Sequence, residues 1–385
     1  MQFVLVDLPD RIHFYPFCLT RSLTELRVGI YTIQERWDAF LETKCEVYTE
    51  SYLQGLYEAS FLNHSDPVVF INATCIPDGA VKTAILNLKE GESLLDEDGK
   101  WIATITKERS IGKILLGEPH LKTSIPAKLI KNALHLLQLN AFFIQSDFDQ
   151  IKAKEITSVV DHTNRLICPE NIFIAPGATL TGVSLNATEG PIYIGKNAVL
   201  MEGVAIRGPF VIGEKGVVKM NASIYGATSV GPFCTVGGEI KNSILLGYSN
   251  KAHEGYLGDS IIGHWCNLGA GTSNSNVKNT AGPIQIWNQH LKSWNTVGNK
   301  MGMLVGDYTR FAIQSSINTG SYIGVSANIY GNGLLPKMIP NFSWGTTKGY
   351  VLDKAIEDIQ NWKKMKGFQI TEAEKGVLSA LFHME

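Results

Sequence analysis

The sequence lacks several features that mark common classes of protein. No apolar run approaches the roughly 18 residues that a membrane-spanning helix needs. The 34 basic and 36 acidic side chains give a formal charge of −2, so there is no excess of positive charge for nucleic acid. The six cysteines include no Cys-x-x-Cys pair, which favours reduced thiols over a disulfide framework or a zinc site. We therefore expect a cytoplasmic protein that binds neither nucleic acid nor membranes.

What the sequence does contain is an apolar residue at every sixth position over two long stretches. This period fits neither an α-helix nor an ordinary strand. It is typical of a parallel β-helix, in which each short strand places one branched aliphatic side chain inside the coil and small residues turn the corners. The two series are Ile194, Leu200, Ile206, Ile212, Val218, Ile224, Val230 and Val236, and Val305, Phe311, Ile317, Ile323, Ile329 and Leu335.

Changes in this pattern predict the domain organisation. Residues 1–155 alternate short apolar runs with helical stretches, which indicates an α/β domain. Residues 156–170 are a predicted linker, and residues 171–340 form the predicted β-helix. Residues 341–385 form a tail with two amphipathic helices, the second beginning at a capping box, and we expect this tail to cover the open end of the β-helix.

The hexads are interrupted twice, at 237–255 and at 275–304. A coil of fixed size does not accommodate extra residues internally, so both segments are expected to loop outward. Loops that protrude from a rigid scaffold often carry functional sites.

The first interruption opens the segment with the most informative motifs. Lys241 stands twelve residues before His253, which begins the motif His-x-x-Tyr256-x-Gly-Asp259, and Ile262-Gly-x-x-x-Asn267-x-Gly-Ala-Gly-Thr follows before Asn276. Over residues 229–277 these spacings resemble the acetyltransferase half of the bifunctional N-acetylglucosamine-1-phosphate uridylyltransferase/glucosamine-1-phosphate acetyltransferase family. The resemblance implies that the α/β domain is nucleotidyltransferase-like and that the β-helix is left-handed. It also implies a homotrimer with its acetyl-transfer site between subunits, and acetyl-CoA as cosubstrate.

His253 is the candidate catalytic base. An amine that attacks a thioester must lose a proton, and histidine is the side chain whose pKa lies near neutrality. Glu254 and Asp259 are nearby carboxylates that can orient it, and Lys241 is a candidate for holding a sugar phosphate. The alternatives are an ordinary exposed histidine and a solvated lysine.

The resemblance assigns further residues by position. It implies that Tyr256 and Asn267 contact the sugar and that Asn276 and Gly331 contact acetyl-CoA. Packing within the coil is the alternative for Tyr256, and an asparagine ladder along the β-helix is the alternative for both asparagines. Backbone amides of residues 267–271 are candidates for an oxyanion hole.

Three positions nearby call for separate comment. His264 stands in the middle of a hexad and is expected to be an ordinary surface residue. The chain departs from the family in having no counterpart of a phosphate-binding Arg on an earlier coil. Ile313 stands where a Ser is common in the coenzyme groove.

The N-terminal half departs further, because no glycine precedes Gly29 and the Gly-rich phosphate loop of sugar-nucleotide pyrophosphorylases is missing. Arg11, Arg21 and Arg27 are candidates for binding the triphosphate of UTP, with Mg²⁺ held by Asp7. The alternative is that these arginines form structural ion pairs with Asp7, Asp10 and Glu25.

Together these features predict an enzyme that transfers an acetyl group to glucosamine 1-phosphate and a uridylyl group from UTP to N-acetylglucosamine 1-phosphate, giving UDP-N-acetylglucosamine. One alternative is a nucleotidyltransferase whose β-helix is only structural or regulatory. Another is a sugar-nucleotide-binding protein without catalytic activity. The sequence leaves open a different amino sugar or a different nucleotide.

Overall fold

The computed structural model describes residues 1–63, 65–116, 121–152 and 161–384. Its internal contacts define two compact units. Helix α5 (Ala133–Lys152) belongs to the second unit, whereas the predicted boundary at residue 155 assigned it to the first. Unit 1 comprises Met1–Phe14, Arg21–Leu26 and Tyr31–Asn132, and unit 2 comprises Tyr15–Thr20, Arg27–Ile30 and Ala133–Glu385.

Unit 1 is an α/β domain, as predicted. Its six-stranded sheet has the order β4-β1-β5-β7-β6-β8, in which β1 runs parallel to β4 and β5, and β7 runs antiparallel to β5 and β6. Buried aliphatic and aromatic side chains, among them Val4, Phe61 and Phe70, form one of its core clusters. The elements are β1 (Gln2–Val6), β3 (Tyr31–Thr32), β4 (Glu46–Tyr48), β5 (Val68–Asn72), β6 (Glu92–Leu95), β7 (Trp101–Thr106), β8 (Leu121–Ser124), η1 (Pro9–Phe14), η2 (Leu23–Glu25), η3 (Ser60–Asn63), α1 (Ile33–Leu41), α2 (Ser51–Gln54), α3 (Gly79–Leu86) and α4 (Ile111–Leu116).

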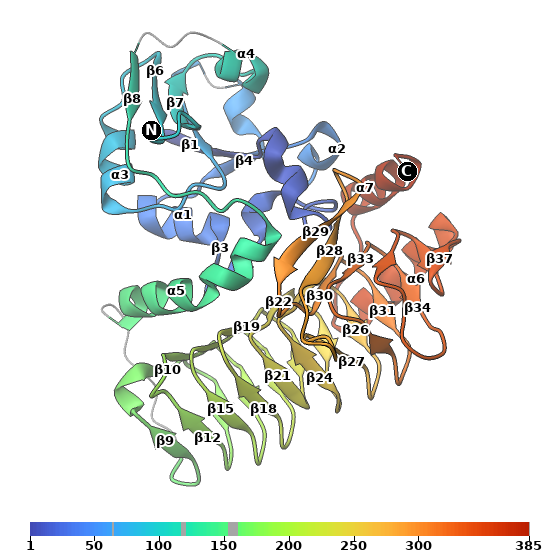
Figure 1. Ribbon diagram of the computed structural model, residues 1–385. Helices are drawn as coiled ribbons and strands as arrows, with labels where there is room; N and C mark the ends of the chain where they lie inside the picture. Colours follow the sequence, from blue (N-terminus) through green and yellow to red (C-terminus); the bar gives the residue numbers. More distant parts are fainter. Residues whose placement is uncertain (64, 117–120, 153–160, 385) are drawn as a thin grey trace. The chain divides into compact units, whose positions relative to one another are not determined.

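Unit 2 is built on a left-handed parallel β-helix, which confirms the predicted fold class (Figure 1). Three sheets form its sides. The first contains β10 (Ile172–Ile174), β13 (Ile192–Ile194), β16 (Phe210–Ile212), β19 (Thr228–Val230), β22 (Ile244–Gly247), β25 (Ile261–His264), β30 (Met303–Val305), β33 (Ser321–Ile323) and β35 (Met338–Ile339). The second contains β11 (Thr179–Leu180), β14 (Val199–Leu200), β17 (Val217–Val218), β20 (Thr235–Val236), β23 (Asn250–Lys251), β26 (Asn267–Leu268), β31 (Arg310–Phe311), β34 (Asn328–Ile329), β36 (Ser343–Trp344) and β37 (Thr347–Lys348). The third contains β9 (Arg165–Ile167), β12 (Ser184–Asn186), β15 (Ala205–Arg207), β18 (Ser223–Tyr225), β21 (Glu239–Lys241) and β24 (Tyr256–Gly258), and β27 (Ser273–Asn274) pairs separately with β32 (Ser316–Ile317).

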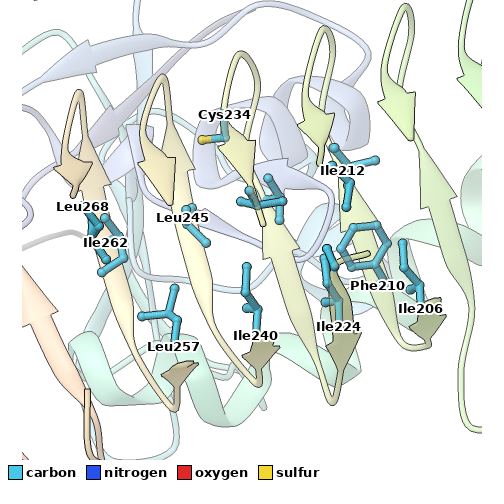
Figure 2. Close-up of a cluster of buried hydrophobic side chains, with 14 of the residues drawn as sticks. Ile206, Phe210, Ile212, Ile224, Cys234, Ile240, Leu245, Leu257, Ile262 and Leu268 are labelled. Atoms are coloured by element: carbon cyan, nitrogen blue, oxygen red, sulfur yellow. The ribbon is translucent and has the colours of Figure 1, made fainter. Parts of the chain in front are cut away.

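The hexad positions line the interior of the coil, as predicted. Every member of both series lies in one buried hydrophobic cluster. Figure 2 shows this arrangement, with Ile206, Ile224, Ile240 and Leu257 pointing inward from consecutive strands of the third sheet. Each coil stacks on the next in register: Ile194 pairs with Ile212, which pairs with Val230.

The expectation of a loop at 237–255 is wrong. Strands β21, β22 and β23 form a complete coil there, and Ile240 and Leu245 join the buried core. The period of six is lost because the corner between β20 and β21 contains only Gly237 and Gly238. The corresponding corner between β14 and β15 contains four residues, 201–204.

The second interruption does leave the coil. Strands β28 (Ile284–Asn288) and β29 (Ser293–Gly298) form a separate antiparallel hairpin. Part of the predicted linker, residues 156–160, lies outside the described residues. The β-helix begins before residue 171, because β9 already pairs with β12 and is followed by η4 (Pro169–Asn171).

The tail forms the two predicted helices, α6 (Leu352–Met365) and α7 (Glu372–His383), the second with a capping box at Thr371. They pack against residues from several coils, including Trp265, Tyr308 and Val325, rather than against one end of the β-helix. Within the part of the chain that the structure describes, no helix is both long and apolar enough to cross a membrane.

Candidate functional site

His253 lies in a corner of the β-helix, not on a free loop. The corner comprises residues 252–255, between β23 and β24, and the His253 side chain is exposed. Its backbone fits tightly between the corners above and below. A Cβ atom at Gly238 would lie 2.8 Å from the His253 carbonyl oxygen, and one at Gly255 would lie 2.2 Å from the carbonyl oxygen of Thr272. The imidazole therefore projects into solvent from a closely packed backbone.

The outer face of the third sheet carries polar side chains beside this corner. Lys241 is in register with Tyr225 on one neighbouring strand and with Gly258 on the other. Its Nζ lies 5.8 Å from the centre of the Tyr225 ring. Gly258 leaves room for Tyr256, since a Cβ atom at Gly258 would lie 2.3 Å from the Tyr256 hydroxyl.

Tyr256 joins a hydrogen-bonded group of polar side chains. Its hydroxyl accepts a bond of 3.1 Å from Asn276 Nδ2, which also donates to Asp259 Oδ2 at 2.5 Å. Asn242 Nδ2 donates to Asp259 Oδ1 at 2.6 Å, so both oxygens of Asp259 bond to amides and neither is committed to His253. Burial raises the pKa of Tyr256 to about 12, with Asp259 and Tyr225 adding to the effect. The phenol therefore keeps its proton at neutral pH and remains a donor.

A cavity of about 110 Å³ adjoins this group. Its walls come from Asn242 and Asp259 of the β-helix, from α5, and from the end of β29 with the segment that follows it. Its lining is Leu134, Leu137, Gln138, Asn242, Asp259, Val297, Lys300 and Met301.

Asn267 and Gly331 lie away from this face. Asn267 belongs to β26 of the second sheet, in register with Asn250 and Arg310, and it accepts a bond of 3.4 Å from the Asn250 side chain. The asparagine-ladder alternative thus describes its contacts. Gly331 is exposed and follows β34 of the same sheet. Asn276, which the resemblance assigns to the coenzyme, donates to Tyr256 and Asp259.

The backbone N–H groups of Asn267, Gly269 and Gly271 donate to the carbonyls of neighbouring coils at 3.0 to 3.2 Å, so coil stacking uses these three of the candidate oxyanion donors. His264 is buried rather than on the surface, and its backbone N–H donates to Asp307 Oδ1 at 2.7 Å. Both follow from the stacking of coils, which a period of six does not reveal.

In unit 1, Asp7 and Arg11 form the ion pair that was the alternative to nucleotide binding. Arg11 Nε lies 3.5 Å from Asp7 Oδ2, and both side chains are buried. Asp7 also accepts hydrogen bonds from Ser22 Oγ at 2.9 Å, from the Leu23 backbone N–H and from Thr49 Oγ1 at 2.6 Å. Burial is the largest influence on the pKa of Asp7 and raises it.

A Mg²⁺ ion does not fit at Asp7. The carboxylate oxygens are already hydrogen-bonded and face a guanidinium, which repels a cation. Among the described residues no group of three or more His, Cys, Asp and Glu side chains is arranged to hold a metal ion.

The other two arginines are also engaged. Arg21 Nη1 lies 2.6 Å from Glu25 Oε2, as the ion-pair alternative predicts. Arg27 is buried and donates to the carbonyl of Ile30. Its segment belongs to unit 2, where the Gly29 N–H donates to Asn140 Oδ1 at 2.8 Å and the Gly29 carbonyl accepts from Ser229 at 3.0 Å. The structure thus divides these arginines between two units.

The fold defines a class of protein in which an α/β domain is joined to a hexapeptide-repeat β-helix, and this β-helix carries the exposed His253. Residues 3–156 match the family model described as sugar nucleotidyl transferase. The chain is similar to the bifunctional GlmU proteins over part of its length, which confirms the resemblance inferred from the motifs.

Two relatives illustrate the extent of the match. "Bifunctional protein GlmU" of Methanococcus vannielii is 29% identical over 39% of this chain and 34% of its own length. "Bifunctional sugar-1-phosphate nucleotidylyltransferase/acetyltransferase" of Sulfurisphaera tokodaii is 33% identical over 24% of this chain and 23% of its own. The matched regions thus span about a quarter to a third of each relative. A solved hexapeptide transferase family protein from Anaplasma phagocytophilum is 16% identical over 58% of this chain and 93% of its own. The TM-score of this match is 0.16.

Proposed function

We propose that this protein transfers the acetyl group of acetyl-CoA to the amino group of glucosamine 1-phosphate. The observation that carries the proposal is the exposed His253 on a closely packed corner, directly before the polar face that holds Lys241, Tyr256 and Asn276. The names of the two relatives, which join a nucleotidylyltransferase to an acetyltransferase or describe a bifunctional protein, support it.

In this proposal His253 takes the proton of the attacking amine. The amine nitrogen forms a bond to the thioester carbon, the bond from that carbon to sulfur breaks, and the coenzyme leaves as a thiol after gaining a proton. The products are N-acetylglucosamine 1-phosphate and free coenzyme A. Because coil stacking uses the amides of Gly269 and Gly271, the proposal assigns them no role in stabilising the oxyanion.

Lys241 and Tyr256 bind the sugar phosphate in this proposal. Lys241 supplies a positive charge, and the Tyr256 hydroxyl supplies a donor because its oxygen already accepts from Asn276. The family resemblance places Asn267 at the sugar and Asn276 and Gly331 at the coenzyme. In this proposal Asn276 stays with Tyr256. Asn267 in β26 and Gly331, which follows β34 of the same sheet, line the coenzyme side.

The test is release of free thiol from acetyl-CoA by the full chain with glucosamine 1-phosphate, with the acetylated sugar identified by NMR. Galactosamine 1-phosphate in a parallel reaction tests the choice of sugar. Thiol release with glucosamine 1-phosphate supports the proposal, and no release with either sugar contradicts it.

A second candidate activity is nucleotidyl transfer from UTP to N-acetylglucosamine 1-phosphate by the α/β domain. The match of residues 3–156 to the sugar nucleotidyl transferase family favours it. Arg21 is the arginine proposed to face the triphosphate, because its ion pair with Glu25 is partly exposed, whereas the Arg11–Asp7 pair and Arg27 are buried. No step is assigned to a metal at Asp7.

Pyrophosphate release from UTP and N-acetylglucosamine 1-phosphate by the full chain tests this activity. Arg21→Ala should lower the rate, and the exposed Arg165→Ala is a matched control. The full chain is required because unit 2 includes the segments 15–20 and 27–30. If the chain acetylates but releases no pyrophosphate, the α/β domain has a different role.

We also propose a homotrimer, as the family resemblance implies, acting in the cytoplasm on small-molecule substrates. Sedimentation at micromolar concentration tests the oligomeric state. A monomer would contradict it.

A further inference from the structure

A lysine occupies a position inside the β-helix that its neighbours fill with aliphatic or aromatic residues. Lys251 pairs with Val236 on one side, and Leu268 of β26 takes the corresponding place on the next coil. It is 1% exposed. Lysine is almost never fully buried unless it has partners, so this residue needs an explanation beyond packing.

The partners of Lys251 are two backbone carbonyls. Its Nζ donates to the Gly237 carbonyl at 3.1 Å and to the His253 carbonyl at 2.5 Å. The Lys251 carbonyl in turn accepts from the Gly237 N–H at 2.7 Å. The side chain therefore connects the two-residue corner Gly237–Gly238 to the corner that carries His253.

The pattern of backbone bonds shows why a side-chain donor is needed there. In a regular four-residue corner, the carbonyl of the second corner residue accepts a hydrogen bond. The donor is the backbone N–H of the third residue in the corresponding corner of the next coil. Glu202 thus accepts from Asn221 at 3.1 Å, and Ala270 accepts from Gln314 at 2.7 Å. In the His253 corner, the N–H of Gly271 donates at 3.2 Å to Glu254, the third residue, instead. The Lys251 ammonium takes the place of the missing backbone donor to the His253 carbonyl.

We propose that Lys251 is a positioning residue for His253. Its ammonium group holds the His253 carbonyl from inside the coil and so fixes the corner that presents the imidazole to the substrate. This inference rests on the proposed acetyl transfer. Glu254, in the same corner, is the charged group that acts on Lys251, and it favours the ammonium form.

The test compares Lys251→Met with Leu268→Met in the full chain. Both variants place methionine at an interior position of the second sheet, but only the first removes the charge. We expect Lys251→Met to remain folded and to lower kcat for acetyl transfer at least tenfold with little change in KM. Leu268→Met should leave kcat within about twofold of the wild type. An unchanged kcat in Lys251→Met would overturn the proposal.

A second measurement does not depend on the proposed function. Hydrogen exchange of the Gly237 and Gly271 amides, which bond to the Lys251 and Glu254 carbonyls, reports the order of this corner. We expect at least tenfold faster exchange in Lys251→Met and no change in Leu268→Met. If the wild type does not acetylate, the proposed function fails, and this exchange alone decides whether Lys251 fixes the corner. Unchanged exchange overturns the inference in either case.

Discussion

Two buried cations, one in each unit, have different partners. In unit 1 the Arg11 guanidinium lies beside the carboxylate of Asp7, the residue that directly follows β1. In unit 2 the Lys251 ammonium lies among aliphatic side chains, and its hydrogen bonds go to the carbonyls of Gly237 and His253. The Arg11 charge is balanced by an opposite charge, so a structural role accounts for it. The Lys251 charge has no such partner among its hydrogen bonds, and one of them ends on the backbone of the exposed His253, so we relate Lys251 to the candidate site.

The largest expected effect is on the rate of acetyl transfer when the exposed side chain of His253 is removed. His253→Ala should lower kcat for acetyl transfer by roughly 10²- to 10⁴-fold if His253 is the general base. Stability should change little, because the side chain is exposed. Steady-state kinetics and thermal unfolding measure the two effects. His162→Ala, which removes another exposed histidine, is the control, and equal rates in both variants would remove His253 from the mechanism.

The next effect is the pH dependence of stability, which should differ between the wild type and Lys251→Met. Burial lowers the pKa of Lys251 from 10.5 to about 8, although Glu254 opposes the shift. Between about pH 8 and pH 10.5 the unfolded chain therefore binds a proton that the folded chain has released, and the stability of the wild type rises with pH. Lys251→Met lacks this gain, so the wild type should gain up to about 3 kcal/mol relative to the variant across this window in urea unfolding. A difference that is constant with pH would contradict the assignment.

The smallest of these effects concerns the polar face. Lys241→Ala should raise the KM for glucosamine 1-phosphate about tenfold, which is about 1.4 kcal/mol, because the lysine contributes binding in the ground state. The kcat should remain within a factor of about two. Lys219→Ala removes a lysine from an earlier corner and should leave both constants unchanged. A fall in kcat with constant KM would instead place Lys241 in the transition state.

The repeat explains how much of the fold could be predicted. Each coil contacts mainly its neighbours, so a short local pattern such as Ile194, Leu200 and Ile206 is enough to predict how the coils stack. The coil containing Ile240 and Leu245 was missed because the two-residue corner at Gly237 shifts the register. The sheet order of unit 1 has no such local signal, because its strand pairs join distant segments.

The candidate site was predicted in part. The motif predicted His253 on an outward loop, and the structure places it in a corner between β23 and β24 with its side chain exposed. Its catalytic role and the roles of Lys241 and Tyr256 stay predictions. Lys251 was not predicted, because the repeat predicts apolar residues at interior positions. Its signal was available in the sequence, since Lys251 stands two residues before His253 and seventeen before Leu268. The pairing of Arg11 with Asp7 was one of two readings that charge alone does not separate.

One measurement tests the central contrast most directly: the change in unfolding free energy at pH 7 for Arg11→Met and for Lys251→Met. Hydrogen exchange in increasing urea, resolved to peptides of β1 and of β20–β26, gives the value for each unit. Arg11→Met should lose about 3 to 5 kcal/mol because it leaves the Asp7 carboxylate buried without its partner. Lys251→Met should change the unfolding free energy by less than about 3 kcal/mol, because the removal of a buried charge offsets the loss of two hydrogen bonds to backbone carbonyls. Losses of similar size in both variants would show that Lys251 supports the fold as Arg11 does, and would contradict its assignment to the site.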